Sequence, residues 1–249
     1  MEKTFKPCVA ELIGTFALVF LAGGAACAGR VPGNQVPVQS YVVAVALAAG
    51  FAYAAAVSAT VNVSGGFLNP AITLTLWVFR RLDGARAAWL IGAQLVGALL
   101  AGGALRLTFG GDAFNPATPH LNLDAFKASG EGSLPLAVLL SGAGIELALT
   151  FLLTFAIFGT MLDPRAPRLS GLGAGLALAA DVFVGFALTG AAVNPARWLG
   201  PAAWELASTT GAMRDHAVYW IGPTLGALLA GAAYTALVLP DERKPGPGA

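Results

Sequence analysis

Hydrophobic residues in this 249-residue chain gather into six long runs that are separated by short polar segments. About 20 apolar residues in a helix are needed to cross the roughly 30 Å hydrocarbon core of a bilayer. Each run is long enough, so each predicts a membrane-spanning helix. The six expected spans are residues 8–29, 40–62, 85–107, 135–160, 169–190 and 216–239.

Two further apolar segments, residues 70–79 and 195–206, are too short to cross, because ten helical residues reach only about 15 Å. Each begins at an Asn-Pro-Ala box that follows a Gly-containing turn. Asn is a good helix N-cap, and Pro suits the first helical position. The boxes Asn69-Pro70-Ala71 and Asn194-Pro195-Ala196 therefore predict two re-entrant half-helices that begin at mid-depth. Irregular backbone at that depth must lie inside protein or line a wet cavity.

A third copy of the three letters, residues 115–117, has different surroundings. It follows Gly110-Gly111-Asp112 and precedes Thr118-Pro119, so no apolar half-helix begins there. We expect a turn in an extracellular loop. His120 in this loop and His216 at the start of the last span stand alone in the sequence. We expect no ligand role for either, no metal site and no cofactor.

The chain is also an internal repeat. Residues 10–16 resemble residues 145–151, and in both halves a second span, an Asn-Pro-Ala half-helix and a third span follow. Three spans per half is an odd number, so the halves must have opposite topology. We predict an all-α membrane protein with six transmembrane helices and two re-entrant half-helices in an inverted repeat. The single channel domain divides into a first repeat of about 1–128, a second of about 129–240 and a disordered tail, 241–249.

Composition agrees with a multi-pass membrane protein. Only 11% of residues are charged, whereas soluble proteins average about 25%. The net charge of +1 gives no argument for nucleic acid as a partner. Lysine and arginine mark the cytoplasmic side of membrane proteins. If both termini lie in the cytoplasm, nine such residues lie inside and four outside, with Arg197 left aside. The nine inside are Lys3, Lys6, Arg80, Arg81, Arg86, Arg165, Arg168, Arg243 and Lys244. The four outside are Arg30, Arg106, Lys127 and Arg214.

Charged residues inside the spans need partners, because one costs roughly 2.5–3.5 kcal/mol at the centre of a bilayer. Glu11 and Glu146 stand at equivalent places in the two halves, which suits a structural role. Asp181 is a third such acid without a clear assignment. Arg197 directly follows the second box and should line a wet outer mouth.

The paired boxes in inverted halves, the repeated Glu-x-x-x-Thr-Phe motif and Asn194-Pro195-Ala196-Arg197 resemble the aquaporin, or major intrinsic protein, family over essentially the whole chain. In aquaporins, pore diameter, hydrogen-bonding groups, an arginine and half-helix dipoles are known to set selectivity. The resemblance implies a passive channel for water and small neutral solutes that excludes protons and ions. Asn69 and Asn194 would each keep a side-chain amide free for passing water.

The resemblance also implies roles for other residues. Glu11 and Glu146 would each accept backbone N–H groups from a pore loop. The narrowest part of the pore, the selectivity filter, would be formed by Ala49, Val182, Ala191 and Arg197. Water-selective members resemble Phe, His and a small residue beside the Arg, so this filter is expected to be wider and less polar unless Phe51 or Phe186 leans in. Such a filter favours a facilitator of glycerol, urea, ammonia or metalloid acids.

Other positions favour a water channel, namely Tyr219-Trp220 and Ala202, while Phe67 and Trp198 depart from the usual residues of the family. Two other classes stay open: an ion-coupled secondary transporter, which can also have inverted repeats, and a non-conducting structural membrane protein. An enzyme is not expected, because no nucleophile motif or His/Cys/carboxylate cluster stands out. The resemblance implies a homotetramer in a lipid bilayer, and we expect the cell (inner) membrane.

Overall fold

The computed structural model describes residues 2–33, 36–127, 134–166, 169, 171–205 and 215–238. Within these residues the fold is all helical, and six helices are long and apolar enough to cross a membrane. They agree with the expected spans to within a few residues, except that the first begins six residues earlier. The six are α1 (Glu2–Ala28), α2 (Val38–Thr60), α4 (Gly84–Phe109), α6 (Leu136–Ile157, extended by a π-helical turn, η2, Phe158–Leu162), α7 (Leu172–Thr189) and α10 (His216–Leu237).

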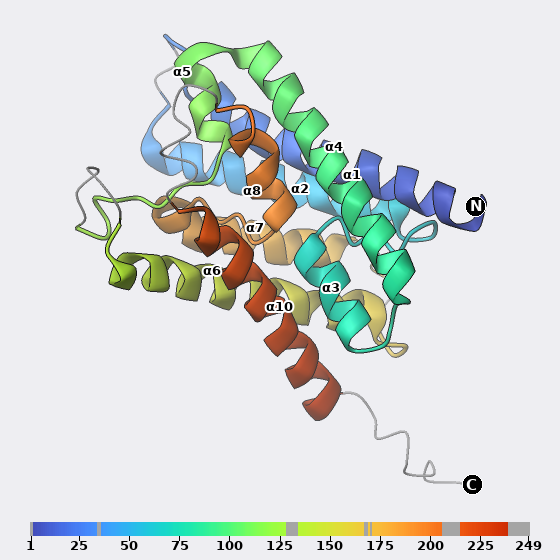
Figure 1. The fold of residues 1–249 in the computed structure, drawn as a ribbon. Helices are drawn as coiled ribbons and strands as arrows, with labels where there is room; N and C mark the ends of the chain where they lie inside the picture. Colours follow the sequence, from blue (N-terminus) through green and yellow to red (C-terminus); the bar gives the residue numbers. More distant parts are fainter. Residues whose placement is uncertain are drawn as a thin grey trace, which may run out of the picture.

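Two short helices begin at the Asn-Pro-Ala boxes, α3 (Pro70–Val78) and α8 (Pro195–Ala202). In Figure 1, α3 lies toward the end of the bundle where the chain begins, and α8 lies toward the opposite end, near α5. The half-helices therefore enter the bundle from opposite ends, as the inverted repeat predicts.

Helix pairing follows the repeat. In the first half α1 packs along α4, in the second half α6 packs along α10, and α2 and α7 join the halves. Glycines allow these close approaches: a side chain at Gly97 would collide with the carbonyl of Leu12, and one at Gly226 would collide with the carbonyl of Leu147. Small residues at helix contacts are typical of membrane proteins, where packing rather than hydrophobic burial joins helices.

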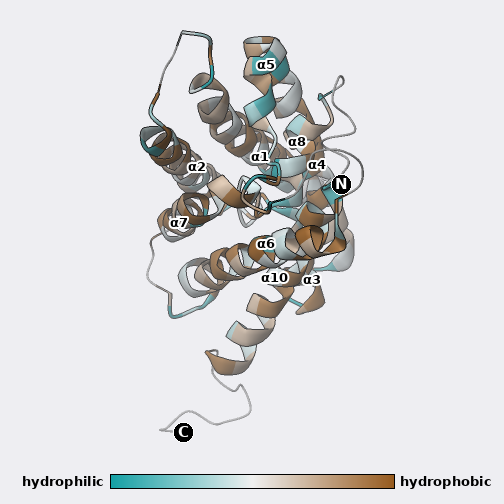
Figure 2. Ribbon diagram, turned by 90° about the vertical axis from the view of Figure 1, so that its left-hand side faces the viewer, coloured by the Kyte–Doolittle hydropathy of each residue, from teal (hydrophilic) through white to brown (hydrophobic). Residues whose placement is uncertain are grey.

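The outward faces of the helices are apolar. Phe51, Trp89, Leu140 and Val184 are each more than 60% exposed, whereas the buried interior contains Glu11, Asn69, Glu146 and Asn194. Figure 2 shows this arrangement, with apolar helices around polar segments at the centre of the bundle. This distribution suits a protein whose outer surface contacts the hydrocarbon core of a bilayer and whose polar groups are satisfied inside the bundle.

The segment with the third Asn-Pro-Ala is more ordered than a simple loop turn. It forms a four-residue helix, α5 (Gly111–Phe114), and a 3₁₀ turn, η1 (Asn115–Ala117). Phe114 and Ala117 are fully buried and pack with Leu105 and Cys27. As predicted, no half-helix begins at this box. The predicted repeat boundary near 128 and the tail 241–249 lie outside the described residues.

Candidate functional site

Each half-helix is capped by the asparagine of its box. The Oδ1 atom of Asn69 accepts from the backbone N–H of Ala71 at 3.0 Å. The Oδ1 atom of Asn194 accepts from the N–H of Ala196 at 2.9 Å and of Arg197 at 3.3 Å. In both caps the side-chain oxygen satisfies N–H groups that the first helical turn leaves unpaired. Each amide nitrogen therefore points away from its own helix.

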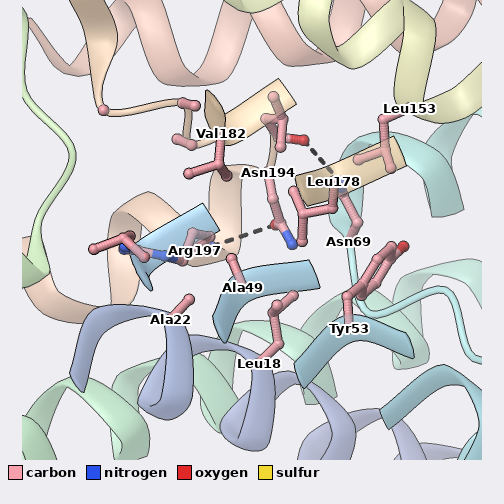
Figure 3. Close-up of a pocket in the computed structure, with 15 residues that line it drawn as sticks. Leu18, Ala22, Ala49, Tyr53, Asn69, Leu153, Leu178, Val182, Asn194 and Arg197 are labelled. Atoms are coloured by element: carbon pink, nitrogen blue, oxygen red, sulfur yellow. Dashed lines mark hydrogen bonds between the residues drawn. The ribbon is translucent and has the colours of Figure 1, made fainter. Parts of the chain in front are cut away.

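The two boxes meet through these amide nitrogens. Nδ2 of Asn69 donates to the carbonyl oxygen of Val193 at 2.8 Å, and Nδ2 of Asn194 donates to the carbonyl oxygen of Leu68 at 2.8 Å. Both asparagines line the same narrow cavity, shown in Figure 3. The sequence predicts an amide that can donate to a passing water, and in the structure one of the two N–H groups of each amide is already engaged. The other N–H of each amide has no hydrogen-bond partner among the described residues.

The residue before each asparagine has an unusual backbone conformation. Leu68 has φ 53° and Val193 has φ 46°. Left-handed backbone is rare for such side chains and costs of order 1–3 kcal/mol. In this conformation the N–H of each residue reaches a glutamate while its carbonyl reaches the opposite asparagine. The left-handed conformation therefore lets one residue bind the supporting glutamate through its N–H and the opposite asparagine through its carbonyl.

Glu11 on α1 supports the first pore loop. Its Oε1 accepts from the N–H of Phe67 at 3.0 Å and from the hydroxyl of Ser64 at 2.6 Å. Its Oε2 accepts from the N–H of Leu68 and from Nε2 of Gln94, both at 2.7 Å. The side chain is fully buried. A buried carboxylate is tolerated when donors surround it, and four donors surround this one.

Glu146 on α6 repeats the arrangement for the second pore loop. Its Oε1 accepts from the hydroxyl of Thr189 at 2.6 Å and from the N–H of Ala192 at 3.0 Å, and its Oε2 accepts from the N–H of Val193 at 2.7 Å. Sequence reasoning missed the hydroxyl partners. A signal was present, since Ser64 and Thr189 each stand five residues before the asparagine of their box.

Arg197 is buried beside the asparagine pair, with 8% of its surface exposed. Its Nη1 donates to the carbonyl oxygen of Ala117 at 2.6 Å. The residue lines both the narrow cavity and a second, wider depression. Ala117 belongs to the third Asn-Pro-Ala segment, to which we gave no role beyond a turn. Because the contact uses a backbone carbonyl, no side-chain motif could have indicated it.

The narrow cavity has a volume of about 20 Å³. One water needs roughly 10–15 Å³, so the cavity is narrow and on the scale of a water molecule. Its lining includes the four expected filter residues, Ala49, Val182, Ala191 and Arg197. Neither Phe51 nor Phe186 lines the narrow cavity. Phe51 is 65% exposed, and Phe186 lines the adjoining depression together with Arg197, where its ring packs edge-on against Tyr41 with centroids 5.5 Å apart.

Three other residues from the sequence analysis also have defined places. Asp181 is 3% exposed, and its Oδ2 has no hydrogen-bond partner among the described residues. Trp198 stacks on Tyr219, with ring centroids 5.7 Å apart. His120 is not isolated, because its Nε2 lies 3.0 Å from Oε1 of Glu205. Within the described ranges, no three His, Cys, Asp or Glu side chains are grouped as a metal site requires.

Six spanning helices, two opposed half-helices and a narrow central cavity define a multi-pass membrane channel. Comparison with known proteins gives its family. The model of the major intrinsic protein family matches residues 1–234. The chain therefore belongs to the major intrinsic protein family. It is a passive channel for water and small solutes, and it is not an enzyme.

Relatives of similar length support this assignment. The chain is 37% identical to Aquaporin TIP4-4 of Zea mays, over 93% of this chain and 86% of that protein. It is 34% identical to Probable aquaporin TIP3-2 of Arabidopsis thaliana, over 97% and 87% respectively. Among solved structures, the aquaglyceroporin from Plasmodium falciparum matches with a TM-score of 0.76 at 22% identity, covering 94% of this chain and 97% of that one. At this identity the structural match supports the fold alone.

Proposed function

We propose that this channel conducts water in single file between the two half-helices and excludes protons and ions. The supporting observation is the reciprocal contact of Asn69 and Asn194 with the opposite pore loops. Each amide has a second N–H that can donate to the oxygen of a water molecule. Two such donors orient one water, and the positive ends of α3 and α8 repel cations at the same point. Pro70, Ala71, Pro195 and Ala196 serve this site by starting the half-helices in place.

The outer filter in this proposal consists of Ala49, Val182, Ala191 and Arg197. Arg197 donates hydrogen bonds to solute oxygens and repels cations, while the three small side chains set the width. The bond from Arg197 to the carbonyl of Ala117 supports this role, because it fixes the guanidinium beside the cavity. Glu11 and Glu146 act as loop supports, since they lie behind the loops and outside the cavity lining.

A second candidate function is a wider facilitator for glycerol, urea, ammonia or metalloid acids. The observation that favours it is the set of small side chains at three of the four filter positions, Ala49, Val182 and Ala191. Water would pass in either case. The two functions differ in the size of the largest neutral solute.

Stopped-flow light scattering on proteoliposomes tests the proposal. We expect water permeability well above that of empty vesicles, and no change on adding an uncoupler. A flux that needs an ion gradient would indicate a coupled transporter instead. Folded protein without any flux would indicate a structural membrane protein. Fluxes of ammonia, urea and glycerol then separate the two candidate pores.

We further propose that the channel is a homotetramer in the cell membrane with both termini in the cytoplasm. The excess of Lys and Arg on the side of the termini supports the orientation. Cross-linking of the detergent-solubilised protein tests the assembly, for which four subunits are expected and a monomer would contradict it. Membrane fractionation tests the location, and recovery with an internal membrane such as the vacuolar one would contradict it.

A further inference from the structure

Four side chains surround the asparagine pair at equivalent positions of the two repeats. One pair is Leu18 on α1 and Leu153 on α6, each seven residues after the supporting glutamate of its repeat. The other pair is Tyr53 on α2 and Leu178 on α7, each sixteen residues before the asparagine of its box. All four line the narrow cavity, and three of them are leucines. The four are Leu18, Leu153, Tyr53 and Leu178.

Tyr53 is the exception in this group, and its ring has a fixed position. Its side chain is 2% exposed. Its hydroxyl donates to the carbonyl oxygen of Phe67 at 3.1 Å, in the loop that leads to Asn69. Figure 3 shows the ring extending from its helix close to Asn69. Because the ring is buried among packed neighbours, packing alone keeps it from moving aside when a larger solute arrives.

Tyr53 also lies farther along the pore than the filter. It follows Ala49 by one helical turn on α2, just as Leu178 precedes Val182 by one turn on α7. A solute that enters past the small filter residues therefore meets the ring of Tyr53 next. The one cavity that the filter residues and Tyr53 line together has a volume of only about 20 Å³, although three of the four filter side chains are small. The limit on solute size thus has to come from side chains other than the alanines.

We propose that the ring of Tyr53, and not the filter around Arg197, sets the largest solute that the channel passes. This inference rests on the proposed water-channel function and adds its size limit. It explains how small side chains at three filter positions and a narrow pore occur in one protein. It also places the step that discriminates by size beside Asn69, where water is oriented.

The repeat itself supplies the test substitution. Tyr53→Leu puts at this position the residue that its counterpart Leu178 already has. The full chain is reconstituted, and stopped-flow measurements give water and glycerol permeabilities. We expect wild type to pass water with little glycerol. In Tyr53→Leu we expect glycerol permeability relative to water to rise about tenfold, which corresponds to a barrier lower by about 1.4 kcal/mol.

Two controls separate the ring from other effects. Tyr53→Phe keeps the ring and removes only the hydroxyl bond to Phe67, so the permeability ratio should stay at the wild-type value. Phe51→Leu makes a similar aromatic-to-leucine change on the same helix at a side chain that is 65% exposed, and it should also leave the ratio unchanged. Should Tyr53→Leu fail to reconstitute, Tyr53→Met, a flexible side chain that fills gaps, carries the same expectation.

The outcomes distinguish this inference from the proposed function. Water flux with an unchanged glycerol ratio in Tyr53→Leu overturns the inference and leaves the water channel intact. Wild-type glycerol flux as high as that of Tyr53→Leu also overturns it, as does a raised ratio in Tyr53→Phe. Wild-type protein that passes no water overturns the proposed function itself.

Discussion

Asn69 binds across the centre of the protein to Val193, with its Nδ2 donating to the carbonyl oxygen at 2.8 Å although the two residues are 124 positions apart. The repeat-related bond from Asn194 to Leu68 completes the pair. Because each accepting carbonyl belongs to a left-handed residue whose own N–H is bound by a glutamate, the asparagines and glutamates form one connected structure. Disturbing either glutamate should therefore affect the centre of the pore.

Glu146→Gln should destabilise the protein by about 1–3 kcal/mol, because an amide nitrogen cannot accept and at least one buried donor loses its partner. Thermal unfolding in detergent measures the loss, and water permeability should fall with it. Asp181→Asn is the matched control, since Asp181 is also a buried acid of the second repeat but has no hydrogen bond at its Oδ2 among the described residues. Equal losses in the two variants would contradict the support role of Glu146.

Gly97→Ala should destabilise the pairing of α1 with α4, because a Cβ at this position overlaps the carbonyl of Leu12. Overpacking of this kind typically costs about 1–3 kcal/mol. Gly92 lies on the same helix, and among the described residues no atom outside its own stretch of helix comes within 4 Å of an added Cβ. Gly92→Ala should thus be neutral or stabilising by up to about 1 kcal/mol, through helix propensity. Unfolding temperatures that rank the two variants the other way would be incompatible with this packing.

Asp163 at the end of η2 should make stability depend on acidic pH. The pKa of its carboxyl is held well below the usual 3.8 by the hydrogen bonds from Arg165, with a further contribution from Tyr234. A lowered pKa stabilises the fold above the unfolded-state pKa, and the contribution disappears as pH falls through the folded-state pKa. Wild type should therefore be more stable than Asp163→Asn at neutral pH, with the difference shrinking below about pH 4. A difference that is the same at pH 7 and pH 3 would argue against the ion pair.

Ala49→Trp should narrow the proposed filter. Ala49 lines the cavity beside Arg197, so an indole there obstructs urea more than water. We expect the ratio of urea to water permeability to fall about tenfold, equivalent to about 1.4 kcal/mol of barrier. Leu47→Trp on the outward side of the same helix is the control, because Leu47 is 39% exposed. Loss of water and urea flux in equal proportion would mean that the residue lies outside the filter.

Much of the fold could be predicted because its causes are local. The length of an apolar run predicts whether it can span the membrane, and Asn followed by Pro before an apolar segment predicts where a helix begins. The membrane-spanning fold was predicted correctly for this reason. The structure places the filter residues and the two asparagines around one cavity, but the roles of these residues stay predictions.

The remainder depends on backbone geometry that residue types do not reveal. Nothing in the letters Leu68 and Val193 indicates left-handed backbone, which determines where their carbonyls point. The contact of Arg197 with Ala117 likewise uses a main-chain oxygen from a segment expected to be a simple turn. Tyr53 was missed because the hydrophobic pattern treats an aromatic ring in a span as one more apolar residue.

The most direct test of the account measures water and proton flux in the same vesicles. Wild-type protein is reconstituted with an internal pH-sensitive dye, and both an osmotic gradient and a pH gradient are applied. The account predicts fast water flux together with a proton leak no greater than that of protein-free vesicles. Water flux no faster than in protein-free vesicles, or a proton flux that rises along with the water flux, would contradict it.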